Sequence, residues 1–301
     1  MEYTILGNTG AEVSRLGFGG APAGLKNYLA PYDPNDQQDA RAVRAALEKA
    51  VELGITYFDS APGYGDGASE RLFGDVLHGL DANVFVATKV GSGHAGKVRA
   101  SLRESLGRLR RDYVDLLQIH GGSYSDEQVA SILGRGGMLD ELEELKRDGL
   151  VRFVGFTSED NNPAVYAFIR SGRFEVMQIC YNLIFQHPYE PSRPYGSLCE
   201  AERAGMGVVT MRTLTSGTFQ RWVRQANPAD TFDYTEPLLQ FVLSNPLVDV
   251  ALIGMRTPEM VVRNTAICEN LAGRIDLSQL HQRYVGQEGD ANGKRIPADQ
   301  R

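Results

Sequence analysis

Short apolar runs alternate with amphipathic segments along almost the whole chain, and this alternation limits the available folds. Each run resembles a buried strand, and each following segment repeats apolar residues every three or four positions, as a helix does. The strand-like runs are Arg15–Gly19, Thr56–Asp59, Val84–Lys89, Tyr113–His120, Val151–Phe156, Val176–Tyr181, Gly207–Met211 and Val248–Ile253. The helix-like segments are Asp39–Leu53, Ser69–Leu80, Lys97–Leu109, Met138–Leu145, Pro163–Ile169, Tyr195–Ala204, Tyr234–Ser244 and Pro258–Glu269.

This order predicts an α/β protein, because strands separated by helices usually pair in parallel. Eight such units in 301 residues are typical of a (β/α)8 TIM barrel. A doubly wound sheet is the alternative, but no G-x-G-x-x-G motif with an acidic residue about 20 positions later is found. Glycines that favour left-handed helix ends precede several strands, at Gly54, Gly149, Gly172 and Gly205.

The two ends of the chain depart from the repeat. Residues 3–13, with glycine and asparagine in the middle, are predicted to form a β-hairpin that closes the barrel bottom. Residues 1–285 are expected to form a single domain. Residues 286–301 are polar and glycine-rich, which predicts a flexible C-terminal tail.

Charge and cysteine usage exclude several classes of protein. The net charge of −7 argues against a nucleic-acid partner. Three scattered cysteines do not form a disulfide framework, so free thiols and a cytoplasmic location are expected. We expect no signal peptide and no membrane segment, since no run of about 18 apolar residues is present.

Polar side chains end three consecutive strand-like runs. They are Asp59, Lys89 and His120, and Tyr64 follows Asp59 in the next loop. Each has an ordinary explanation when taken alone, such as a helix cap, a buried ion pair or an exposed ring. Together they favour an active site, because barrel enzymes build their sites at the carboxyl ends of several strands. Neighbouring strands lie about 4.8 Å apart, so these groups can meet.

These four residues suit proton transfer to an oxygen atom. A tyrosine hydroxyl is a weak acid, and a neighbouring ammonium is expected to lower its pKa. Asp59 would keep Lys89 charged, and His120 would orient a carbonyl group by a hydrogen bond. A hydride donor is also needed, which implies a nicotinamide cofactor.

Several motifs together resemble the aldo-keto reductase superfamily over about residues 1–275. The matching segments are Leu6–Gly10, Val13–Gly19, Phe58–Ala61, Tyr64–Gly65, Ser69–Glu70, Ala87–Lys89, Asp115–His120, Gln178 and Tyr181–Asn182. The resemblance implies that Tyr64 is the general acid/base, that Lys89 and Asp59 tune it, and that His120 orients the carbonyl.

The resemblance also implies a site for the nicotinamide end of the cofactor. Thr157 and Ser158 stand where the family has a Ser-Asn pair that holds the carboxamide, and Gln178 matches a second carboxamide contact. Met211, followed by Arg212, stands where many members have an aromatic residue that stacks on the nicotinamide. A thioether packs against a ring less specifically than an aromatic side chain.

The remainder of the implied cofactor site follows the last two strands. Leu214 and Ser216 resemble a pyrophosphate-binding loop. The segment with Gly254, Arg256, Thr257 and Asn264 resembles the one that grips the adenosine 2′-phosphate. An arginine suits a phosphate dianion, so Arg256 predicts NADP in preference to NAD.

Two other functions stay open. One is a lyase that forms a Schiff base on Lys89, and the other is a non-enzymatic, cofactor-binding regulatory subunit. Residues expected to wall the substrate pocket are Pro22, Ala23, Tyr28, Tyr124, Phe185 and Trp222, the last as a lid or a core residue. The sequence predicts a small carbonyl or alcohol substrate but neither its identity nor the oligomeric state.

Overall fold

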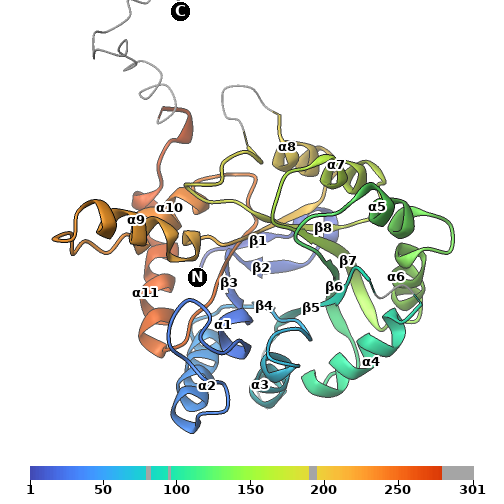
Figure 1. Ribbon diagram of the computed structural model, residues 1–301, viewed down its shortest axis with the longest axis horizontal. Coiled ribbons are helices and arrows are strands. Elements are labelled where there is room, and N and C mark those ends of the chain that lie inside the picture. Colours follow the sequence, from blue (N-terminus) through green and yellow to red (C-terminus); the bar gives the residue numbers. More distant parts are fainter. Residues whose placement is uncertain (79–82, 94–95, 190–194, 280–301) are drawn as a thin grey trace, which may run out of the picture.

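The computed structural model describes residues 1–78, 83–93, 96–189 and 195–279, and its centre is a closed barrel of parallel strands (Figure 1). The strands follow one another around the barrel in chain order, and β10 closes it by pairing with β3. They are β3 (Leu16–Gly19), β4 (Tyr57–Asp59), β5 (Phe85–Gly91), β6 (Val114–His120), β7 (Val151–Ser158), β8 (Val176–Cys180), β9 (Gly207–Met211) and β10 (Val250–Ile253). The predicted TIM barrel is therefore confirmed.

Helices surround the barrel, as Figure 1 shows. They are α1 (Ala21–Gly24), α2 (Gln37–Glu52), α3 (Ala68–Leu77), α4 (Val98–Leu109), α5 (Asp126–Leu133), α6 (Met138–Arg147), α7 (Pro163–Arg170), α8 (Ser197–Arg203), α9 (Thr218–Ala226), α10 (Thr235–Leu243) and α11 (Pro258–Glu269). Side-chain caps start several of them, for example Asp36 on α2 and Asn162 on α7. Gly54, with a φ of 82°, supplies the left-handed turn predicted after α2. No helix in the described ranges is long and apolar enough to cross a membrane.

Three helices were not foreseen, namely α1, α5 and α9, and residues of α1 and α9 line the cavity at the barrel mouth. Helix α5 begins with a capping box between Ser125 and Gln128, a signal that the sequence does contain. Helix α9 carries Trp222, a residue predicted to wall the substrate pocket. Its sequence is strongly amphipathic, but none of its residues is buried.

Two apolar layers explain why the strands are apolar on both faces. One layer fills the space between the barrel and its helices. The other lies inside the barrel and includes Tyr57, Phe85, Leu116, Val176 and Val209, all buried. This inner layer forms an apolar floor beneath the carboxyl ends of the strands.

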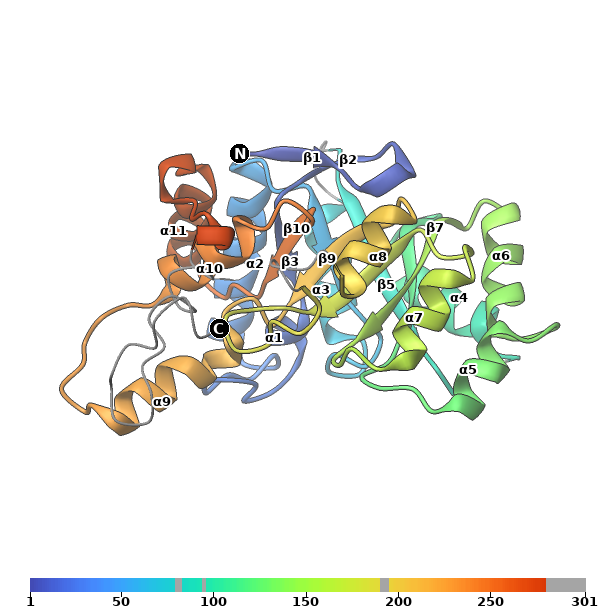
Figure 2. The ribbon, with the colours of Figure 1, turned by 90° about the horizontal axis from the view of Figure 1, so that it is seen from above.

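The predicted hairpin covers the bottom of the barrel. Strands β1 (Tyr3–Ile5) and β2 (Glu12–Ser14) pair antiparallel, and Leu6 and Val13 are fully buried against the inner layer. Figure 2 shows the hairpin at one end of the barrel and α1 and α9 at the other. The predicted tail, 286–301, lies outside the described residues.

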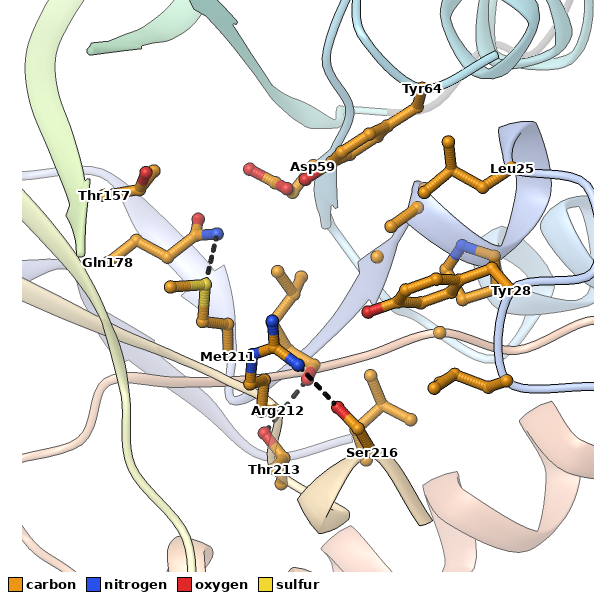
Figure 3. A pocket seen from close by; sticks show the side chains of 18 of the residues that line it. Leu25, Tyr28, Asp59, Tyr64, Thr157, Gln178, Met211, Arg212, Thr213 and Ser216 are labelled. Carbon is orange, nitrogen blue, oxygen red and sulfur yellow. Dashed lines mark hydrogen bonds between the residues drawn. The ribbon is translucent and has the colours of Figure 1, made fainter. Parts of the chain in front are cut away.

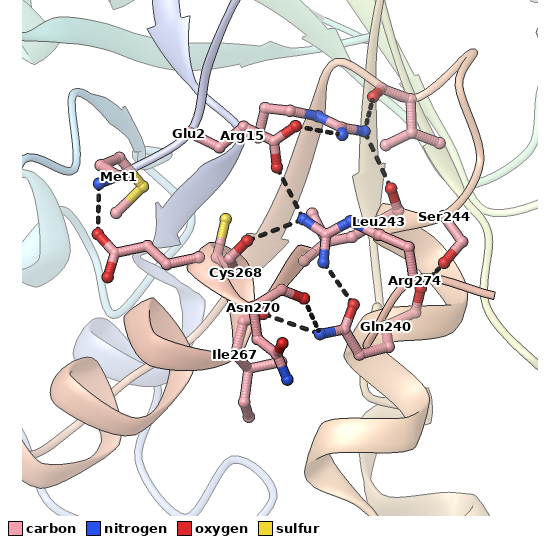
Figure 4. Close-up of polar contacts among 12 residues, drawn as sticks. Met1, Glu2, Arg15, Gln240, Leu243, Ser244, Ile267, Cys268, Asn270 and Arg274 are labelled. Carbon is pink, nitrogen blue, oxygen red and sulfur yellow. Dashed lines mark hydrogen bonds and ion pairs between the residues drawn. The ribbon is translucent and has the colours of Figure 1, made fainter. Parts of the chain in front are cut away.

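A polar network fastens the segment after α11 near this closed end (Figure 4). Arg15 donates to Glu2 Oε1 at 3.0 Å and to the carbonyl oxygen of Val248 at 2.9 Å. Arg274 donates to the other Glu2 oxygen at 2.7 Å and also to Gln240. The Glu2 carboxylate thereby joins the hairpin to the segment after α11 and helps to close this end of the barrel. The open end is the one at the carboxyl ends of the strands.

Candidate active site

A buried ion pair lies at the carboxyl ends of β4 and β5. Lys89 Nζ donates to Asp59 Oδ1 at 2.5 Å and to the carbonyl oxygen of Ser60 at 2.8 Å. The side chains are 1% and 2% exposed, respectively. Gln118 donates to the second Asp59 oxygen at 3.0 Å and to Gln178 at 3.2 Å. Every oxygen of the Asp59 carboxylate therefore has a donor, which a charge so deeply buried requires.

Tyr64 and His120 lie directly against this pair. Lys89 Nζ is 5.1 Å from the centre of the Tyr64 ring, and the Tyr64 and His120 rings meet edge to face at 5.7 Å. Figure 3 shows the Tyr64 ring reaching toward Asp59. The parallel register brings the ends of β5 and β6 together, since Gly91 pairs with His120. The four residues that the sequence singled out thus form one cluster.

Glycine makes the position of Tyr64 possible. A Cβ atom at Gly24 in α1 would lie 2.2 Å from the Tyr64 carbonyl oxygen, and one at Gly65 would lie 2.1 Å from the Gly24 oxygen. These are distances that no side chain tolerates, so α1 and the loop after β4 pack backbone to backbone.

Burial and neighbouring charges together set the pKa values of the cluster. It raises the pKa of Asp59, although Lys89 and Gln118 oppose it. Burial acts to lower the pKa of Lys89, but the charges of Asp59 and Tyr64 outweigh it and the net pKa is raised. Lys89 is therefore held as an ammonium.

Lys89 acts to lower the pKa of Tyr64, as predicted, but burial raises that pKa by more. Burial raises the pKa of Tyr64 above its ordinary value, and the charge of Lys89 together with its hydrogen bond only reduces that rise. The expectation of a lowered pKa is wrong for this arrangement, because the ring is desolvated. Burial, followed by the charge of Lys89, lowers the pKa of His120 to about 4, so the imidazole is neutral at pH 7.

A cavity of about 610 Å³ opens above the cluster. Predicted residues that line it are Asp59, Tyr64, Lys89, His120, Thr157, Gln178, Met211, Arg212, Leu214, Ser216 and Gly254. Gln178 Nε2 contacts Met211 Sδ at 3.8 Å, so the thioether lies beside the Gln178 amide in the cavity (Figure 3). The Thr157 hydroxyl is already engaged with the backbone of Gly121, donating to its oxygen at 2.8 Å.

Four predicted cofactor residues do not line the cavity. The Ser158 hydroxyl donates to backbone oxygens of neighbouring loops, including Asp160 at 2.9 Å. Thr257 caps α11 by accepting from Met260 N at 3.4 Å. Asn264 is 2% exposed, and its Oδ1 atom has no partner among the described residues. Arg256 is engaged by the loop after β3, through backbone oxygens of Pro22, Tyr28 and Ala30.

The pocket walls agree only partly with expectation. Pro22 and Tyr28 line the cavity, whereas Ala23, Tyr124 and Phe185 do not. Trp222 is 55% exposed on α9, so it is neither core nor wall in this structure.

Glu159 lines the cavity and was not foreseen from the sequence. Its carboxylate accepts two hydrogen bonds from the Arg212 guanidinium, one of them 2.7 Å long from Nη2. Arg212 also donates to Ser216 at 3.2 Å. Arg212, Thr215 and Ser216 all have left-handed φ angles, between 50° and 58°. The ion pair thereby joins the exits of β7 and β9 across a strained turn.

Comparison with known proteins agrees with this geometry. The model of the Aldo/keto reductase family matches residues 15–238. L-galactose dehydrogenase from Arabidopsis thaliana is 29% identical, over 90% of this chain and 89% of its own. Methylglyoxal reductase YeaE from Escherichia coli is 26% identical, over 86% and 90%. The fold resembles an aldo/keto reductase from Klebsiella pneumoniae, solved with NADP and acetate, with a TM-score of 0.72, 23% identity and coverage of 94% and 96%.

Proposed function

This chain belongs to the aldo/keto reductase family of oxidoreductases, and we propose that it interconverts a small aldehyde or ketone and its alcohol with a nicotinamide cofactor. The observation that best supports the proposal is the Tyr64 ring, which lies beside a buried ammonium and a neutral imidazole at the floor of the cavity. Among the tyrosines that line the cavity, Tyr64 is the one that lies against the buried ammonium of Lys89.

Tyr64 donates a proton to the carbonyl oxygen in the direction of reduction. Its raised pKa keeps the hydroxyl protonated at neutral pH. As the proton leaves, the phenolate that forms is stabilised by Lys89, whose ammonium is held in place by Asp59 and Ser60. In the oxidation direction the same phenolate accepts the proton of the alcohol.

His120 positions the substrate. Its pKa near 4 leaves the imidazole neutral, so it can donate one hydrogen bond to the carbonyl oxygen without competing as an acid. The His120 and Tyr64 rings pack edge to face 5.7 Å apart, so one carbonyl oxygen can lie within reach of both side chains.

The residues around the cavity fit a nicotinamide dinucleotide. A cavity of about 610 Å³ is within the range of about 300–1,000 Å³ usual for such sites. Gln178 lies near the cluster to bind a carboxamide, and Ser216 lies farther along to bind phosphate. Arg212 can join Ser216 there only by giving up its pair with Glu159. The reduced cofactor supplies the hydride; the protein supplies the proton and the orientation.

The test is Tyr64→Phe, with Tyr113→Phe as the control because Tyr113 lies at the amino end of β6 and is 38% exposed. We expect Tyr64→Phe to lose at least about 100-fold in turnover, since general acid catalysis contributes about 10²–10⁴-fold. Cofactor affinity, measured by titration calorimetry, should be unchanged. Turnover equal to that of the wild-type protein would refute the role of Tyr64.

The two alternative functions, a Schiff-base lyase and a regulatory subunit, make different predictions from those of a reductase. A Schiff-base lyase needs a neutral lysine, whereas Asp59 keeps Lys89 protonated. A panel that includes aldose sugars and short dicarbonyl compounds is indicated by the names of the relatives. Turnover of any of them would also exclude a purely regulatory subunit.

Two further parts of the proposal depend on single features. Cys180, Cys199 and Cys268 are buried free thiols, which supports the predicted reducing, cytoplasmic location. Both NADP and NAD are candidates for the cofactor, since the predicted preference for NADP depends on Arg256 alone.

A further inference from the structure

Arg256 is held by three hydrogen bonds to the loop that connects β3 to α2. Its Nε donates to the Pro22 oxygen at 2.9 Å, Nη2 to the Tyr28 oxygen at 2.7 Å, and Nη1 to the Ala30 oxygen at 3.4 Å. The guanidinium also lies 4.2 Å from the centre of the Tyr32 ring. Three of the five guanidinium N–H groups therefore already donate to loop carbonyls, and the Nε–Nη2 edge that could grip a phosphate is occupied.

The loop of residues 20–32 contains backbone conformations that contacts from other segments must stabilise. Asn27 and Leu29, on either side of Tyr28, have left-handed φ angles of 53° and 66°. Such backbone conformations are strained in residues other than glycine and persist only where surrounding contacts fix them. Pro22, Tyr28 and Leu29 line the cavity, so the clamp fixes part of its wall. Figure 3 shows Tyr28 pointing its hydroxyl into the cavity on the side of Arg212.

No replacement for Arg256 as a phosphate ligand is found among the described residues of this region. The first turn of α11 carries Glu259 and Met260, an acid and a neutral side chain. Arg263, one turn later, pairs with Asp233 at 2.7 Å. Within the described lining of the cavity, the cations are Lys89 and Arg212, and each already has a carboxylate partner. A 2′-phosphate dianion near Glu259 would therefore meet repulsion without a free counter-charge.

We infer that Arg256 is a positioning residue that clamps the 20–32 loop over the cavity, and that the site binds NAD(H) at least as tightly as NADP(H). The inference rests on the proposed use of a nicotinamide cofactor. It replaces the expectation of NADP, which treated Arg256 as a phosphate ligand.

The cofactor half is tested by titration calorimetry of the full chain with NADH and with NADPH. We expect the dissociation constant for NADH to be equal to or smaller than that for NADPH. NADPH binding more than tenfold tighter than NADH would overturn the inference and leave the proposed function intact. Absence of binding by both cofactors would overturn both.

The clamp half is tested with Arg256→Gln and Arg256→Lys, with Arg263→Gln as the matched control on the same segment. If Arg256 is a clamp, Arg256→Gln weakens both cofactors by the same factor, within twofold. Arg256→Lys keeps the charge but loses the fork, so it should behave similarly. A loss confined to NADPH, tenfold or more, would show a phosphate ligand and overturn the inference.

A second measurement does not depend on cofactor at all. Lys26 lies in the loop with a side chain 64% exposed, which makes it a site for trypsin. Release of the loop should speed cleavage after Lys26 at least several-fold in both Arg256 variants, but not in Arg263→Gln. Thermal midpoints and circular dichroism confirm that each variant is folded. Unchanged cleavage in folded Arg256 variants would contradict the clamp.

Discussion

Replacing Asp59 by asparagine tests whether charge, rather than shape, holds the cluster of Asp59, Tyr64, Lys89 and His120 together. Asparagine keeps the size of the side chain and can still accept from Gln118, but it removes the only carboxylate within 2.5 Å of Lys89 in the described structure. Because the lysine side chain is 1% exposed, water cannot replace the lost charge. The ammonium is then left buried and unpaired, or it loses its proton.

The burial of both partners sets the size of the effect. Removing one partner of a fully buried pair costs about 3–5 kcal/mol. For a chain of this size, about 2 °C of thermal midpoint corresponds to 1 kcal/mol, so Asp59→Asn should lower the midpoint by about 6–10 °C. An exposed pair of the same length provides the comparison. Arg99 Nη2 lies 2.5 Å from Asp148 Oδ2, but these side chains are 39% and 49% exposed.

The assay is urea unfolding at pH 7, supported by thermal melts. Asp148→Asn should change the unfolding free energy by less than about 1 kcal/mol, because solvent screens that pair. The double variant Asp59→Asn with Lys89→Met should regain most of the stability lost by Asp59→Asn, since it removes the buried charge. The account would be refuted if the unfolding free energy of Asp59→Asn lay within about 1 kcal/mol of wild type and the double variant were less stable than Asp59→Asn and than Lys89→Met alone.

Three other outcomes follow from the same geometry. Since burial lowers the pKa of His120 to about 4, below its ordinary 6.5, the unfolding free energy should fall as pH drops from 6.5 toward 4. His120→Gln should flatten that part of a urea-derived pH profile; an unchanged slope would contradict it. Gly24→Ala puts a Cβ atom 2.2 Å from the backbone carbonyl oxygen of Tyr64 and so displaces that residue. Turnover should drop by about 100-fold with an unaltered circular dichroism spectrum. The Tyr57 hydroxyl is buried without a partner among the described residues, so Tyr57→Phe should leave the thermal midpoint unchanged or raise it.

The barrel and the grouping of four polar residues at one end of it could be predicted because both depend on short-range patterns. Strand-like runs and helix periodicity are read over about ten residues, and a polar residue that ends each of three neighbouring runs must reach the same barrel face. Asp59, Lys89 and His120 therefore followed from position alone. Helix α5 was missed because its 8 residues are too few to show clear apolar periodicity, although its capping box is a local signal.

What could not be predicted depends on contacts between distant segments. Arg256 and Tyr28 are 228 positions apart, and nothing in either segment shows that the loop carbonyls compete with a phosphate for the guanidinium. The pKa of Tyr64 was predicted in the wrong direction for a related reason. The charge of Lys89 is visible in the sequence, but the desolvation that outweighs it arises only from packing.

The apolar floor of the barrel also bears on the proposed role of Tyr64. Below Asp59 and Lys89 the described interior is formed largely by buried apolar side chains and the hairpin, including Leu6 and Val13. If Tyr64 protonates the substrate as proposed, we expect the replacement proton to come from the side of the cavity mouth. Its return would then wait until product has left.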